Sequence, residues 1–291
     1  MARQRLQPPV SAAQLELAIG RERVADRNAH KGGRSFYFFD FDDNVMVLET
    51  RIFVFNRKSG EEIALSTREL AHVSDKLGQP GPWEHFELRL DDRTGSFRNF
   101  RDLPRDICSQ AVQPFVHDVV AALGQSEYAW RGPSWSLFDH AVFNERPIAI
   151  ITARGHHSNT VRAGIALLCE RGHLSCEPNY LGIYTVSHPG VRTELGDPDA
   201  RRSIPELKKA AIVAAVEQAI RQYGANPYHR FGMSDDDSAN VALIVEAMKE
   251  LKQRFPENAF FVIDTSKRPV AMTEVYVERT EVSAVEQLTL F

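Results

Sequence analysis

The chain has 291 residues, of which 43% are hydrophobic and 25% are charged, the proportions of an ordinary globular protein. This length allows one large domain or a core with an inserted unit, and a formal net charge of −4 gives no overall sign of a nucleic-acid or anionic-membrane partner. No apolar run approaches the roughly 20 residues that cross a bilayer, and residues 1–20 lack the apolar block of a secretory signal. Three cysteines are too few for a disulfide framework, so we expect a cytoplasmic protein without a membrane partner.

In chain order, the pattern first predicts a short helix around residues 12–26 and then a series of buried strands. Apolar runs typical of such strands occupy residues 35–41, 147–152, 180–186, 229–234 and 260–265. Helical periodicity follows the later runs, at residues 159–172, at residues 203–224, and in a segment that places Val241, Ile244, Met248, Leu251 and Phe255 on one face. Ser203 and Glu206 form the sequence signature of a capping box at the start of the second of these helices.

Strands that alternate with helices predict an α/β protein with a Rossmann-like parallel sheet and helices on both of its faces. Residues 45–146 interrupt this alternation with a hairpin that turns at residues 58–60, a further strand and a helix at residues 109–124. An insertion of this length between two core strands predicts a cap over a site. We therefore expect a core of residues 35–55 and 145–265, a cap at 56–144, an N-terminal helical extension at 1–34, and a C-terminal extension at 266–291 that could add an edge strand or hairpin.

Three carboxylates crowd the end of the first strand, in the sequence SFYFFDFDDNV: Asp40, Asp42 and Asp43. Like charges at a buried strand end repel one another, and this repulsion needs a compensating charge. Asp40 and Asp42 could share a hard cation such as Mg²⁺, which prefers oxygen ligands. The SDDD cluster of residues 234–237, which follows another strand, could supply the remaining oxygens. Because ligands bind beyond the carboxyl ends of parallel strands, these acids are expected to meet at one site.

A site of this kind suits phosphoryl transfer. One Asp could attack phosphorus and form an aspartyl-phosphate, while a second could protonate the leaving oxygen and then activate water. The hydroxyl of Thr152, after the second strand, and the ammonium of Lys208, near a helix start, could hold the phosphoryl oxygens.

At this point the chain resembles the haloacid dehalogenase superfamily of phosphotransferases, over residues 35–55 and 145–265. FFDFDDNV is similar to the family's first motif, a strand followed by D-x-D-x-T/V, which implies that Asp40 is the nucleophile. The same motif implies that Asp42 is the general acid/base and also gives its backbone carbonyl to Mg²⁺. IAIITARG resembles the second motif and selects Thr152 for phosphate binding.

Two further motifs complete the resemblance. ELKKAAI resembles the third and selects Lys208, with Lys209 as the rival. FGMSDDDSAN resembles the fourth and selects Asp235 and Asp236 as metal ligands. The chain departs from the family pattern at Asn44, where the family often has Thr, and the three consecutive Asp residues leave the register of the fourth motif open.

For some other residues, the sequence allows more than one role. Arg154 could contact phosphate or solvate its loop, Lys209 could bind substrate, and Asp43 is expected to shape the turn. The last five residues, QLTLF, resemble the short motif by which bacterial proteins dock on the DNA sliding clamp, with Gln287, Leu288, Leu290 and Phe291 as the contacting residues. The alternative is that these apolar side chains pack on the protein itself.

The sequence thus predicts a Mg²⁺-dependent phosphohydrolase acting on a small phosphorylated substrate. If the tail docks on the clamp, the substrate would instead be a phosphorylated nucleic-acid end. A receiver-like signalling module also clusters Asp, Thr and Lys around Mg²⁺, but its acids follow a different strand order. A relative that keeps the fold only to bind phosphate or Mg²⁺ is the remaining alternative.

Overall fold

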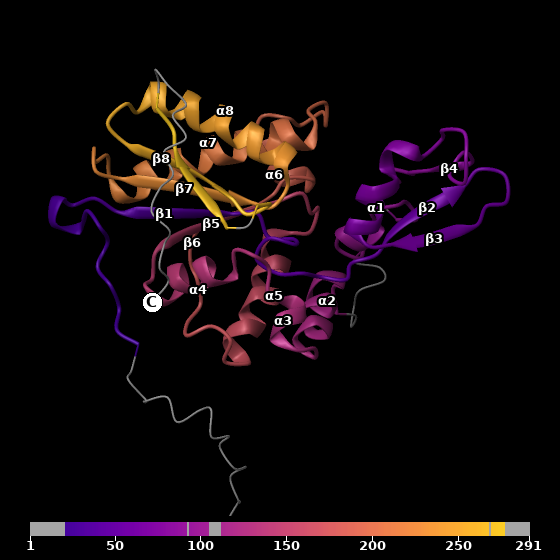
Figure 1. Ribbon diagram of the computed structural model, residues 1–291, viewed down its shortest axis with the longest axis horizontal. Helices are drawn as coiled ribbons and strands as arrows, with labels where there is room; N and C mark the ends of the chain where they lie inside the picture. Colours follow the sequence, from indigo (N-terminus) through magenta and orange to yellow (C-terminus); the bar gives the residue numbers. More distant parts are fainter. Residues whose placement is uncertain (1–20, 92, 105–111, 268, 277–291) are drawn as a thin grey trace, which may run out of the picture.

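The structure, a computed structural model, describes residues 21–91, 93–104, 112–267 and 269–276. It is an α/β protein built on a mostly parallel six-stranded sheet with helices on both faces, which is compatible with the expected Rossmann-like architecture (Figure 1). A smaller three-stranded sheet stands beside it. None of the helices in the described part of the chain is both long and apolar enough to cross a membrane.

The strand order of the main sheet, β6-β5-β1-β7-β8-β9, places the first strand in its middle. The bounds are β1 (Ser35–Phe39), β5 (Pro147–Thr152), β6 (Asn179–Thr185), β7 (Arg230–Asp235), β8 (Ala259–Asp264) and β9 (Ala271–Glu274). All neighbours pair in parallel except β9, which is antiparallel to β8 and confirms the expected C-terminal edge strand. From β1 the chain builds outward to β6 and then returns to the other side of β1 at β7. Such a reversal of strand order is where open α/β sheets bind ligands.

Side chains of the central strands alternate between two apolar layers, as the pleat requires. Phe36 and Phe38 of β1 join one buried cluster, which packs against α7 (Ile204–Tyr223) and α8 (Ser238–Arg254). Phe39 joins a second cluster, on the opposite face, which packs against α2 (Pro114–Leu123), α4 (Trp135–Phe143) and α5 (Ser158–Glu170). Both faces are therefore covered, which explains why the strands read as continuous apolar runs.

The capping box predicted from the sequence is present at the start of α7. The hydroxyl of Ser203 accepts from the backbone N–H of Glu206, whose carboxylate accepts from the N–H of Ser203, and this confirms the capping box of α7. The remaining short helices are α1 (Thr67–Val73), α3 (Glu127–Trp130), α6 (Pro189–Glu194), η2 (Ala29–Lys31), η3 (Ser74–Lys76) and η4 (Arg98–Phe100). The helix expected at residues 12–26 is not continued by residues 21–26, which have no regular structure, and its earlier part lies outside the described residues.

The inserted segment divides at different residues from those expected. β2 (Ile52–Asn56), β3 (Glu62–Leu65) and β4 (Phe86–Glu87) form the small sheet and, with α1, a small lobe (residues 50–104) that has its own apolar cluster around Val54. Residues 114–143, expected within the cap, instead form α2 to α4, which join the apolar cluster on one face of the main sheet through Phe115 and Phe138. The sequence shows that a helix has an apolar face, but it does not show which part of the protein that face will pack against.

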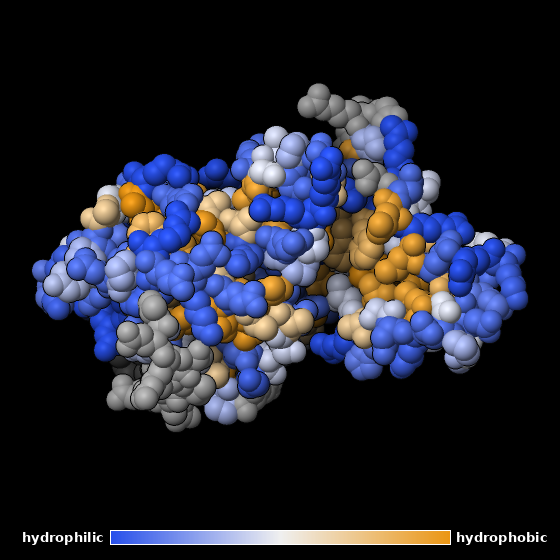
Figure 2. Space-filling model, turned by 90° about the horizontal axis from the view of Figure 1, so that it is seen from above, coloured by the Kyte–Doolittle hydropathy of each residue, from blue (hydrophilic) through white to orange (hydrophobic). Residues whose placement is uncertain are grey.

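The small lobe lies to one side of the main lobe (Figure 1). Figure 2 shows that the surface is hollowed between the two lobes and that apolar side chains gather on the small lobe. The expected hairpin is present, since β2 and β3 pair antiparallel across the turn at Gly60, whose φ of 74° suits glycine.

Replacing Phe38 by Ala tests the importance of the middle strand. The ring is 1% exposed in the cluster shared with α7 and α8, so its loss should lower the free energy of unfolding by about 3–5 kcal/mol in urea denaturation. Tyr128→Ala is the control, because that ring is 99% exposed and its removal should change stability by less than about 0.5 kcal/mol. Equal effects of the two changes would contradict this packing.

Candidate active site

Four segments that are far apart in the sequence meet at the carboxyl end of the main sheet. Asp40 directly follows β1, Thr152 ends β5, Asp235 ends β7, and Lys208 lies near the start of α7. All four side chains are buried. These strand ends therefore lie together at one edge of the sheet, as the sequence predicts.

The centre of the site is a buried ammonium between two carboxylates. Lys208 Nζ lies 2.6 Å from Asp40 Oδ1 and 3.3 Å from Asp235 Oδ2. Burial by itself lowers the pKa of Lys208, but the charges of Asp40 and Asp235 outweigh burial and raise it above its ordinary value. Lys208 is therefore a permanent positive charge in the site.

One ammonium does not balance the acids around it. Burial raises the pKa of Asp40 well above its ordinary value; Lys208 opposes this rise, whereas the charges of Asp235 and Asp42 add to it. Burial, followed by the charge of Asp235, raises the pKa of Asp236 to about 7. A bound cation would oppose both shifts, because it favours the charged form of each carboxyl group.

Three of the expected metal ligands form a group that fits a divalent cation. Asp40, Asp235 and Asp236 each offer a carboxylate oxygen, and these oxygens lie within 4.8 Å of one another. Oxygen ligands with surplus negative charge are the donor set that Mg²⁺ prefers. The carboxylate of Asp42 is not part of this group and faces other partners, so any ligand from Asp42 would be its backbone carbonyl, as the sequence suggested.

Asp42 is held by residues at the end of β5 and directly after it. Thr152 Oγ1 donates to Asp42 Oδ2 at 2.9 Å, and the guanidinium of Arg154 reaches both carboxylate oxygens, with its shortest contact at 2.6 Å. Arg154 is 1% exposed, so the alternative that it only solvates its loop is wrong. Its pairing with Asp42 has no signal in the sequence.

Asn44, which departs from the family pattern, is a positioning residue beneath the acids. Its Nδ2 donates to the backbone carbonyls of Asp40 (3.1 Å) and Ser234 (3.0 Å), and its Oδ1 accepts from the hydroxyls of Ser134 and Thr265, both at 2.8 Å. The side chain is completely buried with all its hydrogen-bonding capacity used. It ties the ends of β1, β7 and β8 together beneath the acids.

Asp43 and Asn240 have supporting contacts. Asp43 has a φ of 57°, in the left-handed region, and its N–H donates to the carbonyl of Met46 at 2.8 Å, as expected for a residue that shapes the turn. Its carboxylate also accepts from Thr67 of α1 at 2.7 Å and so contacts the small lobe. Asn240 donates to Asp235 Oδ1 at 3.2 Å and orients that carboxylate.

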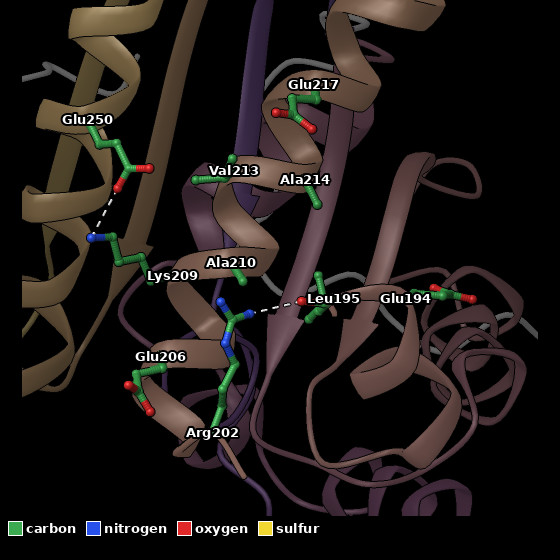
Figure 3. A pocket seen from close by; sticks show the side chains of 10 residues that line it. All are labelled: Glu194, Leu195, Arg202, Glu206, Lys209, Ala210, Val213, Ala214, Glu217 and Glu250. Atoms are coloured by element: carbon green, nitrogen blue, oxygen red, sulfur yellow. Dashed lines mark hydrogen bonds and ion pairs between the residues drawn. The ribbon is translucent and has the colours of Figure 1, made fainter. Parts of the chain in front are cut away.

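Lys209 does not belong to the site, and its prediction as a substrate-binding residue is corrected. Its ammonium lies 3.1 Å from Glu250 of α8 and lines a surface pocket of about 480 Å³ between α6, α7 and α8 (Figure 3). The pocket is lined by four glutamates against two cations, which does not suit a phosphorylated ligand. Residues one apart on a helix point about 100° apart, so only one of the two lysines can face the sheet. The sequence did contain a signal, because Lys208 lies on the same face as the buried Ala211 and Ile212.

Other expectations lie outside the described residues. Among them is the suggested clamp-binding tail, with Gln287, Leu288, Leu290 and Phe291, and its role stays a prediction from the sequence.

Comparisons with protein-family models, with curated proteins and with solved structures found no match to this chain.

The pKa of Asp236 predicts how the affinity for Mg²⁺ depends on pH. Below pH 7 this carboxyl is protonated and a poor ligand, whereas above pH 7 it is a carboxylate. Calorimetric titration with Mg²⁺ should therefore show an affinity that rises up to about tenfold per pH unit below pH 7 and then levels off.

Asp236→Asn should remove the change centred near pH 7 and weaken binding at pH 8. Asp237→Asn is the matched control, since Asp237 caps α8 by accepting from the N–H of Ala239, a role that Asn also fills. It should keep the wild-type pH dependence. The same affinity at pH 5.5 and pH 8 in the wild type would contradict the assignment of Asp236.

Proposed function

We propose that this protein is a Mg²⁺-dependent phosphatase of the haloacid dehalogenase type, which hydrolyses a phosphate monoester through an aspartyl-phosphate on Asp40. The observation that carries the proposal is the convergence of Asp40, Thr152, Lys208 and Asp235 at one edge of the sheet, each from the motif that the family resemblance selected. A chance combination of four short motifs would have no reason to converge in this order at the switch point of the sheet.

In the first step of the proposed reaction, a carboxylate oxygen of Asp40 attacks phosphorus. The bond between phosphorus and the ester oxygen breaks, and the leaving oxygen takes a proton from the carboxylic acid of Asp42. In the second step, water attacks the phosphorus of the aspartyl-phosphate and gives a proton to the Asp42 carboxylate. The bond between phosphorus and the Asp40 oxygen then breaks, which releases inorganic phosphate and restores both side chains.

The surrounding groups support this chemistry. Lys208 keeps Asp40 in place and offers positive charge where phosphoryl oxygens would lie, and Thr152 can donate a hydrogen bond to one of them. Mg²⁺ bound by Asp40, Asp235 and Asp236 would neutralise phosphate charge and allow a dianion to approach the acids. Burial strengthens each of these electrostatic interactions.

We propose that the small lobe is the cap of this phosphatase and selects its substrate, which we expect to be a small phosphorylated molecule. In the sequence, the lobe begins at residue 50, shortly after the turn that carries Asp40. Two of its residues contact the site: Thr67 donates to Asp43, and Thr50 accepts from Arg154. A lobe joined to the site at these points is well placed to cover a bound substrate.

Phosphate release from an aryl phosphate and from a panel of sugar phosphates, nucleotides and DNA ends tests the proposal. Release should require Mg²⁺, should fall about 10⁴-fold or more in Asp40→Asn, which lacks the nucleophile, and should fall about 10²- to 10³-fold in Lys208→Met. Lys209→Met is the matched control, since that ammonium pairs with Glu250 outside the site, and it should stay within about twofold of wild type.

Thermal unfolding of each variant in Mg²⁺ separates lost chemistry from lost structure. Activity that persists in Asp40→Asn would overturn the nucleophile assignment. Mg²⁺ binding without turnover across the panel would favour a non-catalytic module that binds phosphate or Mg²⁺.

A further inference from the structure

Arg154 is buried although its charge is permanent. Its side chain follows β5, and its guanidinium carbon lies 4.7 Å and 4.8 Å from the ring centroids of Phe100 and Phe115. A guanidinium cannot lose its proton in a protein, and placing it away from water is unfavourable unless an anion accompanies it. The contacts of Arg154 therefore show which anion the fold provides.

That anion is Asp42. Arg154 Nε lies 2.9 Å and 3.0 Å from the two carboxylate oxygens, and Nη2 lies 2.6 Å from Oδ1. The planar fork of an arginine matches a carboxylate in this way, which fixes the direction of the carboxylate as well as its charge. Asp42 Oδ1 carries the shorter of these contacts and is the more firmly held of its two oxygens.

A second layer of contacts holds Arg154 itself. Nη2 also donates to Thr50 Oγ1 at 2.7 Å, and the Thr50 hydroxyl donates to Asp118 Oδ2 at 2.6 Å. The remaining nitrogen, Nη1, is buried and finds no hydrogen-bond partner among the described residues. A bound phosphate cannot reach a guanidinium enclosed in this way, so the arrangement does not support Arg154 as a phosphate ligand.

Thr152, unlike Arg154, can exchange its hydrogen-bond partner. Its single hydroxyl proton is donated to Asp42 Oδ2 at 2.9 Å, and in the proposed reaction the same proton is needed for a phosphoryl oxygen. When Thr152 turns to phosphate, Asp42 Oδ2 loses that partner and keeps only the 3.0 Å contact with Arg154 Nε, so it has a lone pair available for the proton of the reaction. Only the contacts with Arg154 then keep the carboxyl group in place.

We infer that Arg154 is a positioning residue that holds Asp42 in its working orientation while Thr152 exchanges Asp42 for the phosphate. The inference rests on the proposed phosphatase function and assigns Arg154 to the proton-transferring group rather than to the substrate. Thr50 and Asp118 extend the same support to the base of the small lobe and to α2.

Arg154→Lys tests the inference, because lysine keeps the charge but not the fork. The kcat for the best substrate of the panel should fall about 10²-fold, as expected when a catalytic group is misplaced, while KM and the affinity for Mg²⁺ change less than about twofold. Thr50→Val keeps the shape of the side chain and removes the acceptor; its kcat should fall about tenfold, and it carries the test if Arg154→Lys does not fold.

Arg146→Lys is the matched control. Arg146 pairs with Asp26 at 2.8 Å in a similarly buried ion pair, but it precedes β5 and so lies at the opposite end of the sheet from the site. Its replacement should lower stability and leave kcat unchanged. In Arg154→Ala, added guanidinium ion at millimolar concentration should restore part of kcat, which it would not do if Arg154 served stability alone.

The results of these experiments distinguish the inference about Arg154 from the proposed phosphatase function. An unchanged kcat in Arg154→Lys and Thr50→Val, or a raised KM with unchanged kcat, would overturn the inference and leave the phosphatase proposal standing. An equal loss of kcat in Arg146→Lys would also overturn it. A wild-type protein that releases no phosphate from any member of the panel would overturn both.

Discussion

The ammonium of Lys208, buried between Asp40 and Asp235, is the contact on which the arrangement of the site depends. Without it, two strand ends would bring carboxylates together in a water-poor space, at a cost of several kcal/mol for each uncompensated charge. The ammonium comes from α7, the helix that also covers one face of the sheet. Packing and charge are therefore coupled, since the apolar contacts of α7 bring the cation to the acids.

The buried amide of Asn44 provides a neutral counterpart to this charged contact. It joins the ends of β1, β7 and β8 with hydrogen bonds to Asp40, Ser234 and Thr265, so the backbone beneath the acids cannot shift one strand at a time. Buried polar groups that are fully satisfied favour a unique arrangement, whereas a partly satisfied network destabilises the fold. In the proposed phosphatase, this network keeps the nucleophile fixed while the charge around it changes.

The other proposed catalytic acid, Asp42, is held differently. Asp40 is held by the core, through Lys208, whereas Asp42 is held by Arg154, which in turn contacts Thr50 at the base of the small lobe. The two carboxylates thus differ in their surroundings although they are only two residues apart. A division of this kind suits one group that must stay in place to attack and another that must receive and release a proton.

The sequence by itself determined the strands, the long helices and the set of acids, because these depend on local periodicity, capping and residue type. It also indicated that the acids of β1 and β7 meet, since parallel strands bring their carboxyl ends to one edge. Two things were decided only in the tertiary structure: that Arg154 pairs with Asp42, and that α2 to α4 join the apolar cluster on one face of the main sheet. Each depends on which surfaces pack together over long separations in the chain, and a charged or apolar side chain does not reveal its distant partner until the fold supplies it.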